Sequence, residues 1–213
     1  MQACVLTYLS LGLNETGAAR EQLWAAGLAC WLCFECLLRP GEMFKLQVRD
    51  VVLPDFDGPE PALVIIVREP KTRRIWRSQF VLCKDFRLML WFQWWVMDRS
   101  SSSRLFPLSK ETFSSILQRV CAILGVTSCR FTPSSFRSGG ATEHFKVHEN
   151  LAMLQYHGRW TVPRTLEHYL HVAFSASIMA ELTAEAKACL EVVLRHVSRL
   201  SAPPRRALCE LLV

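Results

Sequence analysis

The stretch from Leu23 to Leu38 constrains the fold more than any other part of the sequence, because it is apolar almost throughout. It is shorter than the ~20 residues that a membrane-spanning helix needs, and Glu35 interrupts it. Pro40 and Gly41 then end the pattern, as helix-breaking residues do. We therefore expect a helix from about Arg20 to Leu38, buried in the core of a globular domain that does not enter a membrane.

Three cysteines in this stretch, Cys30, Cys33 and Cys36, are spaced three residues apart and raise the question of a metal site. Their neighbours are mostly large and apolar, and no fourth ligand follows at a zinc-like spacing. Free cysteine is common in protein cores, so we expect a buried helix face with neither a metal nor another cofactor. The chain has nine cysteines, an odd number, which favours a reduced, intracellular setting.

The order of the predicted elements gives the fold class. The expected helices are 20–38, 42–46, 84–97, 109–124, 132–146, 150–156, 162–169 and 175–198, and the expected strands are 48–53, 62–67 and 75–82, with a hairpin tip at 68–74. Strands that precede a run of helices, without regular alternation, are typical of α+β domains. We therefore predict an α+β, mainly helical fold with a small antiparallel sheet and hairpin.

The chain is expected to hold one main domain. Residues 21–200 contain the predicted strands and helices apart from the first residue of the 20–38 helix, while residues 1–20 are too few for a domain of their own. We interpret residues 1–20 as an N-terminal remnant or linker, and residues 201–213, which include a Pro-Pro-Arg-Arg run, as a C-terminal tail.

The charge of the chain favours a polyanionic partner. The formal net charge is +6 and the sequence pI is near 9.0, values that fit nucleic acid or an anionic membrane surface. Cleavage of a phosphodiester requires a nucleophile, positive charge on the phosphoryl oxygens and a proton for the leaving oxygen. Arginine suits the second role because its fork binds two oxygens and stays ionised.

Five residues that suit this chemistry, two of them arginines, occur in a characteristic order along the chain. An arginine precedes Pro-Gly-Glu, a lysine precedes Thr at the hairpin tip, a second arginine precedes Ser-Gly-Gly-Ala-Thr, and a Gly-Arg-Trp segment lies nine residues before a tyrosine. These residues are Arg39 with Glu42, Lys71, Arg137, Trp160 and Tyr169.

This ordered set resembles the catalytic domain of the tyrosine recombinase (phage integrase) family, with a Cre-like tryptophan and tyrosine spacing. The Arg-Ser-Gly-Gly-Ala-Thr and Gly-Arg-Trp segments further resemble recombinases of eukaryotic mobile elements of the crypton and DIRS types. The resemblance covers about residues 20–200. It implies site-specific DNA recombination and integration, in which strands are cut and rejoined.

The resemblance also implies a role for each residue. Tyr169 attacks the phosphate and forms a 3′-phosphotyrosyl intermediate, Arg39 and Arg137 stabilise the charge, Lys71 protonates the leaving 5′ oxygen, and Trp160 packs against the phosphate. Glu42 supports Arg39. Further contacts to DNA are expected from Arg68, Arg73, Arg74, Arg77 and Arg159.

Ser134 departs from the family pattern, which has His or Lys three residues before the second arginine. A serine donates a hydrogen bond there but neither adds charge nor acts as an effective base near neutral pH. The alternative hypothesis is therefore a weakened or inactive DNA-binding protein derived from a mobile element. A type IB topoisomerase fits less well, because that class usually has His where Trp160 stands.

Each residue also has a structural interpretation. Arg39 could bind the last carbonyls of a helix, the basic hairpin could be a solvated surface, Trp160 could be a core residue and Tyr169 an ordinary helix residue. The functional interpretation expects the five to converge on one basic face. The expected partner is double-stranded DNA, bound by a homo-oligomer, a tetramer by resemblance to the family, at an intracellular and, in a eukaryote, nuclear location.

Overall fold

The computed structural model describes residues 1–70, 78–162, 164, 166, 170, 178, 180–198 and 203. The described elements are α1 (Gln2–Leu13), α2 (Gly17–Glu35), α3 (Pro40–Met43), η1 (Val48–Asp50), β1 (Val51–Val52), β2 (Leu63–Val67), β3 (Gln79–Cys83), α4 (Phe86–Val96), α5 (Lys110–Ile123), η2 (Thr127–Cys129), α6 (Pro133–His148), α7 (Leu151–Gly158) and α10 (Ala184–Leu194). Helices predominate, and the strands form one sheet of order β1-β2-β3. The expected α+β, mainly helical class is therefore confirmed.

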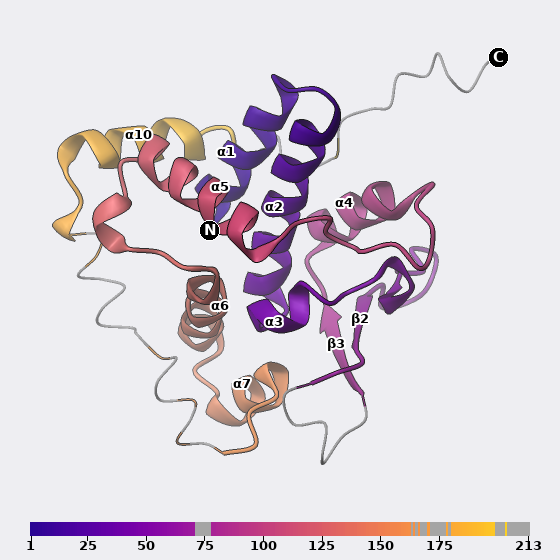
Figure 1. Cartoon of the computed structure of the whole chain (residues 1–213). Coiled ribbons are helices and arrows are strands. Elements are labelled where there is room, and N and C mark those ends of the chain that lie inside the picture. The colour runs from indigo at the N-terminus through magenta and orange to yellow at the C-terminus, as the bar shows by residue number, and fades with distance from the viewer. Residues whose placement is uncertain are drawn as a thin grey trace.

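Helix α2 lies at the centre of the fold, with α1 and α5 beside it (Figure 1). Leu28, Trp31 and Leu32 are buried in the core, so the apolar stretch is a core helix, as expected. Burial raises the pKa of the Cys33 thiol to about 12. Within the described residues, no three Cys, His, Asp or Glu side chains are placed to hold a metal ion. None of the described helices has both the length and the apolar character needed to cross a bilayer.

Helix α1 differs from the expectation for residues 1–20. The sequence predicts a linker or remnant, whereas Val5 and Tyr8 are fully buried in the same core as α2. Buried residues occur at almost every position from Ala3 to Leu9. The one-sided periodicity that identifies a surface helix is therefore missing from this segment, although it forms part of the domain.

The sheet confirms the expected antiparallel pairing. Strands β2 and β3 pair from Leu63 with Cys83 to Val67 with Gln79, so residues 68–78 connect two neighbouring strands. The strand expected over 48–53 is shorter than predicted: η1 occupies its first half and β1 only its second. The Asp50 carboxylate accepts a hydrogen bond from the Gln47 backbone N–H at 2.9 Å, and this capping interaction favours a turn.

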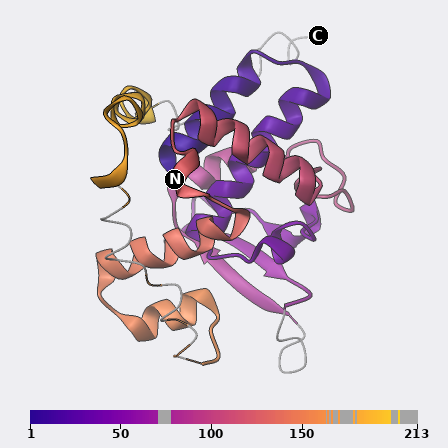
Figure 2. The same ribbon diagram turned by 60° about the vertical axis from the view of Figure 1, so that its left-hand side comes forward.

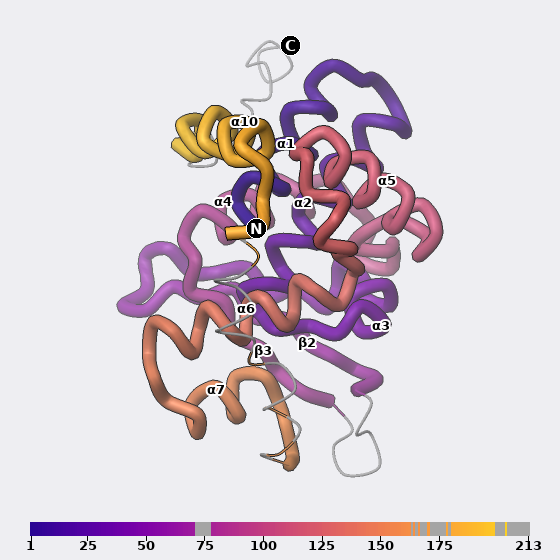
Figure 3. The backbone as a smooth tube through the Cα atoms, turned by 90° about the vertical axis from the view of Figure 1, so that its left-hand side faces the viewer, coloured from indigo at the N-terminus to yellow at the C-terminus, as the bar shows by residue number. Residues whose placement is uncertain are grey.

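The later helices largely follow their local sequence signals. Ser109 and Asn150 cap α5 and α7 by accepting hydrogen bonds from backbone N–H groups two or three positions into each helix. The single helix expected over 175–198 is interrupted, because Thr183 caps a new helix, α10, with its hydroxyl. Most of the helix expected over 162–169 lies outside the described residues. Figures 2 and 3 show α6 and α7 together on the side of the molecule where α3 and the sheet also lie.

Candidate active site

The C-terminal end of α2 is the point on which the candidate site is built. A helix leaves its last carbonyl groups without partners inside the helix, and its C-terminus carries partial negative charge. The Leu37 carbonyl accepts hydrogen bonds from Arg137 and, at 3.3 Å, from Arg159. The Glu35 carbonyl lies 2.8 Å from His157 Nε2. His157 of α7 therefore caps α2, while Arg137 of α6 and Arg159 bind the Leu37 carbonyl, which lies two residues past the end of the helix.

A close approach of α6 to α2 places Arg137 at this end. A Cβ atom added to Gly140 would lie 2.1 Å from the Phe34 carbonyl oxygen and 2.8 Å from Leu37 Cδ2. Only glycine fits this contact, and Arg137 lies one helical turn earlier on α6. Gly140 therefore permits the close approach of two helices.

A left-handed turn after α7 directs Arg159 back towards α2. Arg159 has a φ of 58°, a conformation that side chains other than glycine, asparagine and aspartate adopt rarely. Gly158 precedes it because the Trp160 ring packs over this position: an added Cβ would lie 1.5 Å from Trp160 Cζ3. The Gly-Arg-Trp segment is thus a compact turn that positions both of the side chains that follow the glycine.

Glu42 joins two of the arginines. Its carboxylate accepts hydrogen bonds from the Arg39 backbone N–H at 3.0 Å, from Arg39 Nη1 at 2.7 Å and from Arg159 Nη2 at 2.9 Å. Burial alone would raise the pKa of this carboxyl, but the charges of Arg159 and Arg39 and the hydrogen bonds from Arg39 outweigh burial and lower the pKa. Glu42 is therefore ionised at neutral pH and holds both guanidinium groups.

Arg137 and Trp160 form the buried part of the cluster. Arg137 is 1% exposed and Trp160 is 5% exposed, and the guanidinium carbon of Arg137 lies 4.5 Å from the centroid of the Trp160 ring. Arg137 Nη2 also donates to the Gly158 carbonyl at 2.7 Å. This arginine fastens α6 to α2 and to the turn after α7, with the indole beneath its charge.

The cluster brings together Arg39, Glu42, Arg137, Arg159 and Trp160 through a continuous chain of contacts. Its parts differ in exposure: the Arg39 side chain is 22% exposed, whereas the Arg159 side chain is 7% exposed. The sequence predicts Arg159 as a DNA contact, but the structure places it inside, paired with Glu42. The long-range ion pair that buries it has no local sequence signal.

Two further predicted residues lie on surfaces. Ser134 is exposed in the first turn of α6, where its hydroxyl lies 2.9 Å from that of Thr132. Arg68, predicted to contact DNA, has a side chain that is 51% exposed and forms an ion pair with the buried Asp50. Its guanidinium is therefore already paired with a carboxylate of the protein itself.

Several predicted site residues lie outside the described residues. They are the proposed general acid Lys71, the proposed nucleophile Tyr169, and the predicted DNA contacts Arg73, Arg74 and Arg77.

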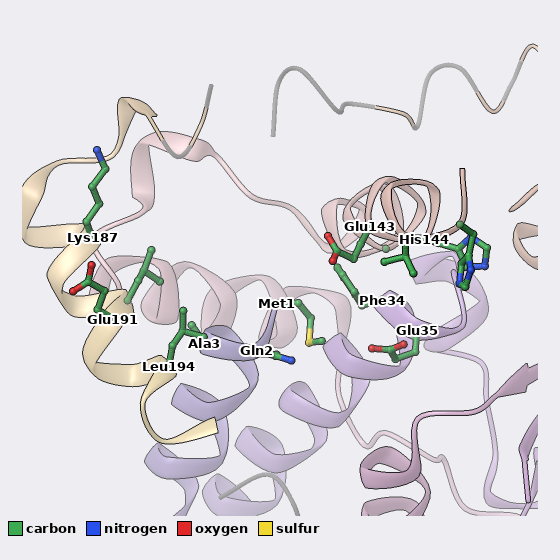
Figure 4. Close-up of a pocket in the computed structure, with 14 residues that line it drawn as sticks. Met1, Gln2, Ala3, Phe34, Glu35, Glu143, His144, Lys187, Glu191 and Leu194 are labelled. Atoms are coloured by element: carbon green, nitrogen blue, oxygen red, sulfur yellow. The ribbon is translucent and has the colours of Figure 1, made fainter. Parts of the chain in front are cut away.

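Three histidines flank the cluster. The His144 ring stacks on the His157 ring with 5.1 Å between their centroids, and the centroid of the His148 ring lies 4.5 Å from that of His144. Burial, the largest cause, and the charges of Arg159 and Arg137 lower the pKa of His157, so its ring is neutral at pH 7. His144 and Glu35 also line a cavity of about 770 Å³ between the N-terminus, α6 and α10 (Figure 4).

Comparison with known proteins identifies the fold. Neither the protein-family models nor the curated proteins give a match to this sequence. The structure is similar to XerH site-specific recombinase bound to its difH substrate before cleavage, with a TM-score of 0.56 and 15% identity over 82% of this chain and 51% of the XerH chain. It is equally similar to the post-cleavage complex of XerH with palindromic difH, with a TM-score of 0.57 and 16% identity over 83% of this chain and 52% of that chain.

The chain thus spans about half the length of the XerH chains that it matches. The expected fold, that of a tyrosine recombinase catalytic domain, is confirmed by this likeness.

Proposed function

We propose that this chain is the catalytic domain of a site-specific recombinase that cuts and rejoins double-stranded DNA through a phosphotyrosyl intermediate on Tyr169. The observation that carries the proposal is the cluster in which Arg39, Arg137, Arg159 and Trp160 meet around Glu42 and the end of α2. The likeness to XerH, a recombinase described in complex with its DNA substrate, supports it.

The electrostatics of the cluster suit a phosphoryl transition state. Three arginines and one carboxylate give a net charge of 3 − 1 = +2. Fixed positive charge in a site from which water is largely excluded stabilises a developing anion without reorganising during the reaction. We assign the direct phosphate contact to Arg39, which is the most exposed of the three, and assign to Arg137 and Arg159 the charge behind it.

The remaining steps fall to residues with complementary chemistry. The Tyr169 hydroxyl gives up its proton to solvent as its oxygen attacks phosphorus. The bond from phosphorus to the 5′ oxygen breaks, and Lys71 supplies the proton that this oxygen takes up. The covalent link keeps the bond energy, so the free 5′ hydroxyl of a partner strand can reverse the step. In this proposal the chain acts as a homo-oligomer on DNA inside the cell, and in a eukaryote inside the nucleus.

A second function is favoured by two specific observations. Ser134 is an uncharged, exposed residue at a position where the family usually has His or Lys, and Arg137 is almost completely buried with its N–H groups directed at carbonyls. Both fit a DNA-binding protein, derived from a mobile element, in which cleavage is weakened or lost.

A trapping experiment separates the two functions. Duplexes that carry a nick, with randomised sequence around it, are incubated with the protein, and SDS-stable protein–DNA adducts are resolved on a gel. A recombinase gives an adduct that disappears in Tyr169→Phe and persists in Tyr156→Phe, a matched control at an exposed position on α7. A gel shift without any adduct would support the binding protein and reject cleavage.

A further inference from the structure

A second group of cations lines a cavity directly beside the candidate active site. The cavity has a volume of about 390 Å³ and lies between residues 42–50, the end of β2 and Arg104. The cations that line it are Lys45, Arg49, Arg68 and Arg104. Glu42, the carboxylate that holds Arg39 and Arg159, lines the same cavity, so the cavity adjoins the candidate site.

Backbone hydrogen bonds fix two of these cations near each other although they are far apart in sequence. The Arg49 N–H donates to the Ser101 carbonyl at 2.9 Å, and the Val48 N–H donates to the Ser103 carbonyl at 3.0 Å. Gln47 pairs with Arg104 as an isolated antiparallel bridge. The loop from Ser100 to Ser103 is therefore held along η1. Arg104, which follows this loop, lies at the cavity that Arg49 also lines.

The four cations differ in what neutralises them. Lys45 Nζ lies 2.7 Å from a Glu69 carboxylate oxygen, and Arg68 pairs with Asp50. Arg49 and Arg104 are exposed, and among the residues that the structure describes neither has a carboxylate within ion-pair distance. Within the described part of the chain, these two guanidinium groups thus form no ion pair, and both line a cavity that adjoins the site.

We propose that this cavity binds the backbone of double-stranded DNA next to the scissile phosphate, with Arg49 and Arg104 each contacting a phosphate. The inference rests on the proposed function, because a strand whose phosphate lies at Arg39 must continue past it over the neighbouring surface. Guanidinium forks match phosphate oxygens in pairs. Contacts of this kind set the register of the duplex and carry no sequence information.

The salt dependence of DNA binding tests the inference on the full chain. Binding of a fluorescent random-sequence duplex is measured by anisotropy for the wild type and for the double variant Arg49→Gln/Arg104→Gln. Each lost phosphate contact lowers the slope of log affinity against log salt by about 0.9, so two lower it by about 1.8. Between about 50 and about 200 mM salt, the affinity of the double variant should therefore fall about 12-fold less than that of the wild type.

Arg195→Gln serves as the matched control, because Arg195 is exposed at the end of α10, at the opposite end of the molecule from α3 and β2 (Figure 1). Its slope should equal that of the wild type. An unchanged slope in the double variant, or an equal change in Arg195→Gln, would refute the inference.

The trapping assay keeps the two proposals apart. Wild-type binding with a lowered slope in the double variant but no covalent adduct would reject cleavage and retain the phosphate contacts. An adduct that forms together with an unchanged slope in the double variant would support cleavage and reject the phosphate contacts of Arg49 and Arg104. Absence of any DNA binding by the wild type would overturn both.

Discussion

Replacement of Gly140 by alanine should separate α6 from α2 and dismantle the candidate site. The added Cβ would lie 2.1 Å from the Phe34 carbonyl oxygen and 2.9 Å from the Phe34 carbonyl carbon. Both are backbone atoms of α2, so no side-chain rotation relieves the overlap and the helices must move apart. Arg137, one turn away on α6, then loses its hydrogen bond to the Leu37 carbonyl.

The expected destabilisation follows from three opposing contributions. Alanine in a helix interior gains about 1 kcal/mol over glycine. Overpacking costs about 1–3 kcal/mol, and each hydrogen bond from the buried guanidinium contributes about 1.5–3 kcal/mol. With one such bond lost, the free energy of unfolding should fall by about 3 kcal/mol for Gly140→Ala.

The neighbouring glycine supplies the control. A Cβ on Gly139 would lie 3.4 Å from Cε2 of the Phe34 ring, an ordinary contact. Gly139→Ala should therefore be neutral or stabilise by up to about 1 kcal/mol. Urea unfolding followed by tryptophan fluorescence and by circular dichroism measures both variants. Equal stability of the two variants would show that the contact between Gly140 and Phe34 does not hold the helices together.

Two further predictions concern the cluster and its departure from the family. Glu42→Gln should lower the free energy of unfolding by about 3 kcal/mol at neutral pH, because a buried guanidinium loses its counter-charge. The pKa of Glu42 is lowered from 4.5 in the folded protein, so the stability that its charge contributes is present above pH 4.5 and is lost as the pH falls through the lowered value. The free energies of unfolding of the variant and the wild type should therefore converge in acid. A difference between them that stays constant with pH would contradict this. Ser134→His should raise the initial rate of adduct formation by up to about 10²-fold, the lower range for a positioned acid–base group; an unchanged rate would mean that position 134 does not reach the reaction.

Local signals in the sequence predicted most of the fold. The helices expected over 109–124 and 150–156 match α5 and α7, whose N-caps are Ser109 and Asn150, and Gly125, with a φ of 68°, follows the end of α5. Such ends are predictable because capping depends on residues only a few positions apart. The antiparallel hairpin was predicted from two segments rich in apolar and β-branched residues. Helix α1 was not predicted because its apolar residues lie on all of its faces and leave no one-sided pattern. The start of a new helix at Thr183 was not predicted because the helical pattern continues on both sides of this residue.

The candidate site was predicted in part, for a different reason. The ordered residues Arg39, Glu42, Arg137 and Trp160 do converge, although each was inferred from a family pattern and not from a local rule. The pairing of Arg159 with Glu42 spans 117 residues and depends on a left-handed turn. No short-range feature of the sequence specifies such a contact.

The burial of Arg137 decides which residues can distinguish a recombinase from a protein that only binds DNA. Arg137 and Arg159 bind the Leu37 carbonyl just past α2 and join this segment to α6 and to the turn after α7, so the fold requires them whether or not DNA is cut. A lineage that lost cleavage would still retain both, and loss of activity in an Arg137 variant would report unfolding as readily as chemistry. Arg39 has local hydrogen bonds to Glu42 and remains partly exposed, so its substitution removes charge from the site with little loss of packing. The test of cleavage therefore belongs to Arg39, together with Lys71 and Tyr169, the proposed general acid and nucleophile.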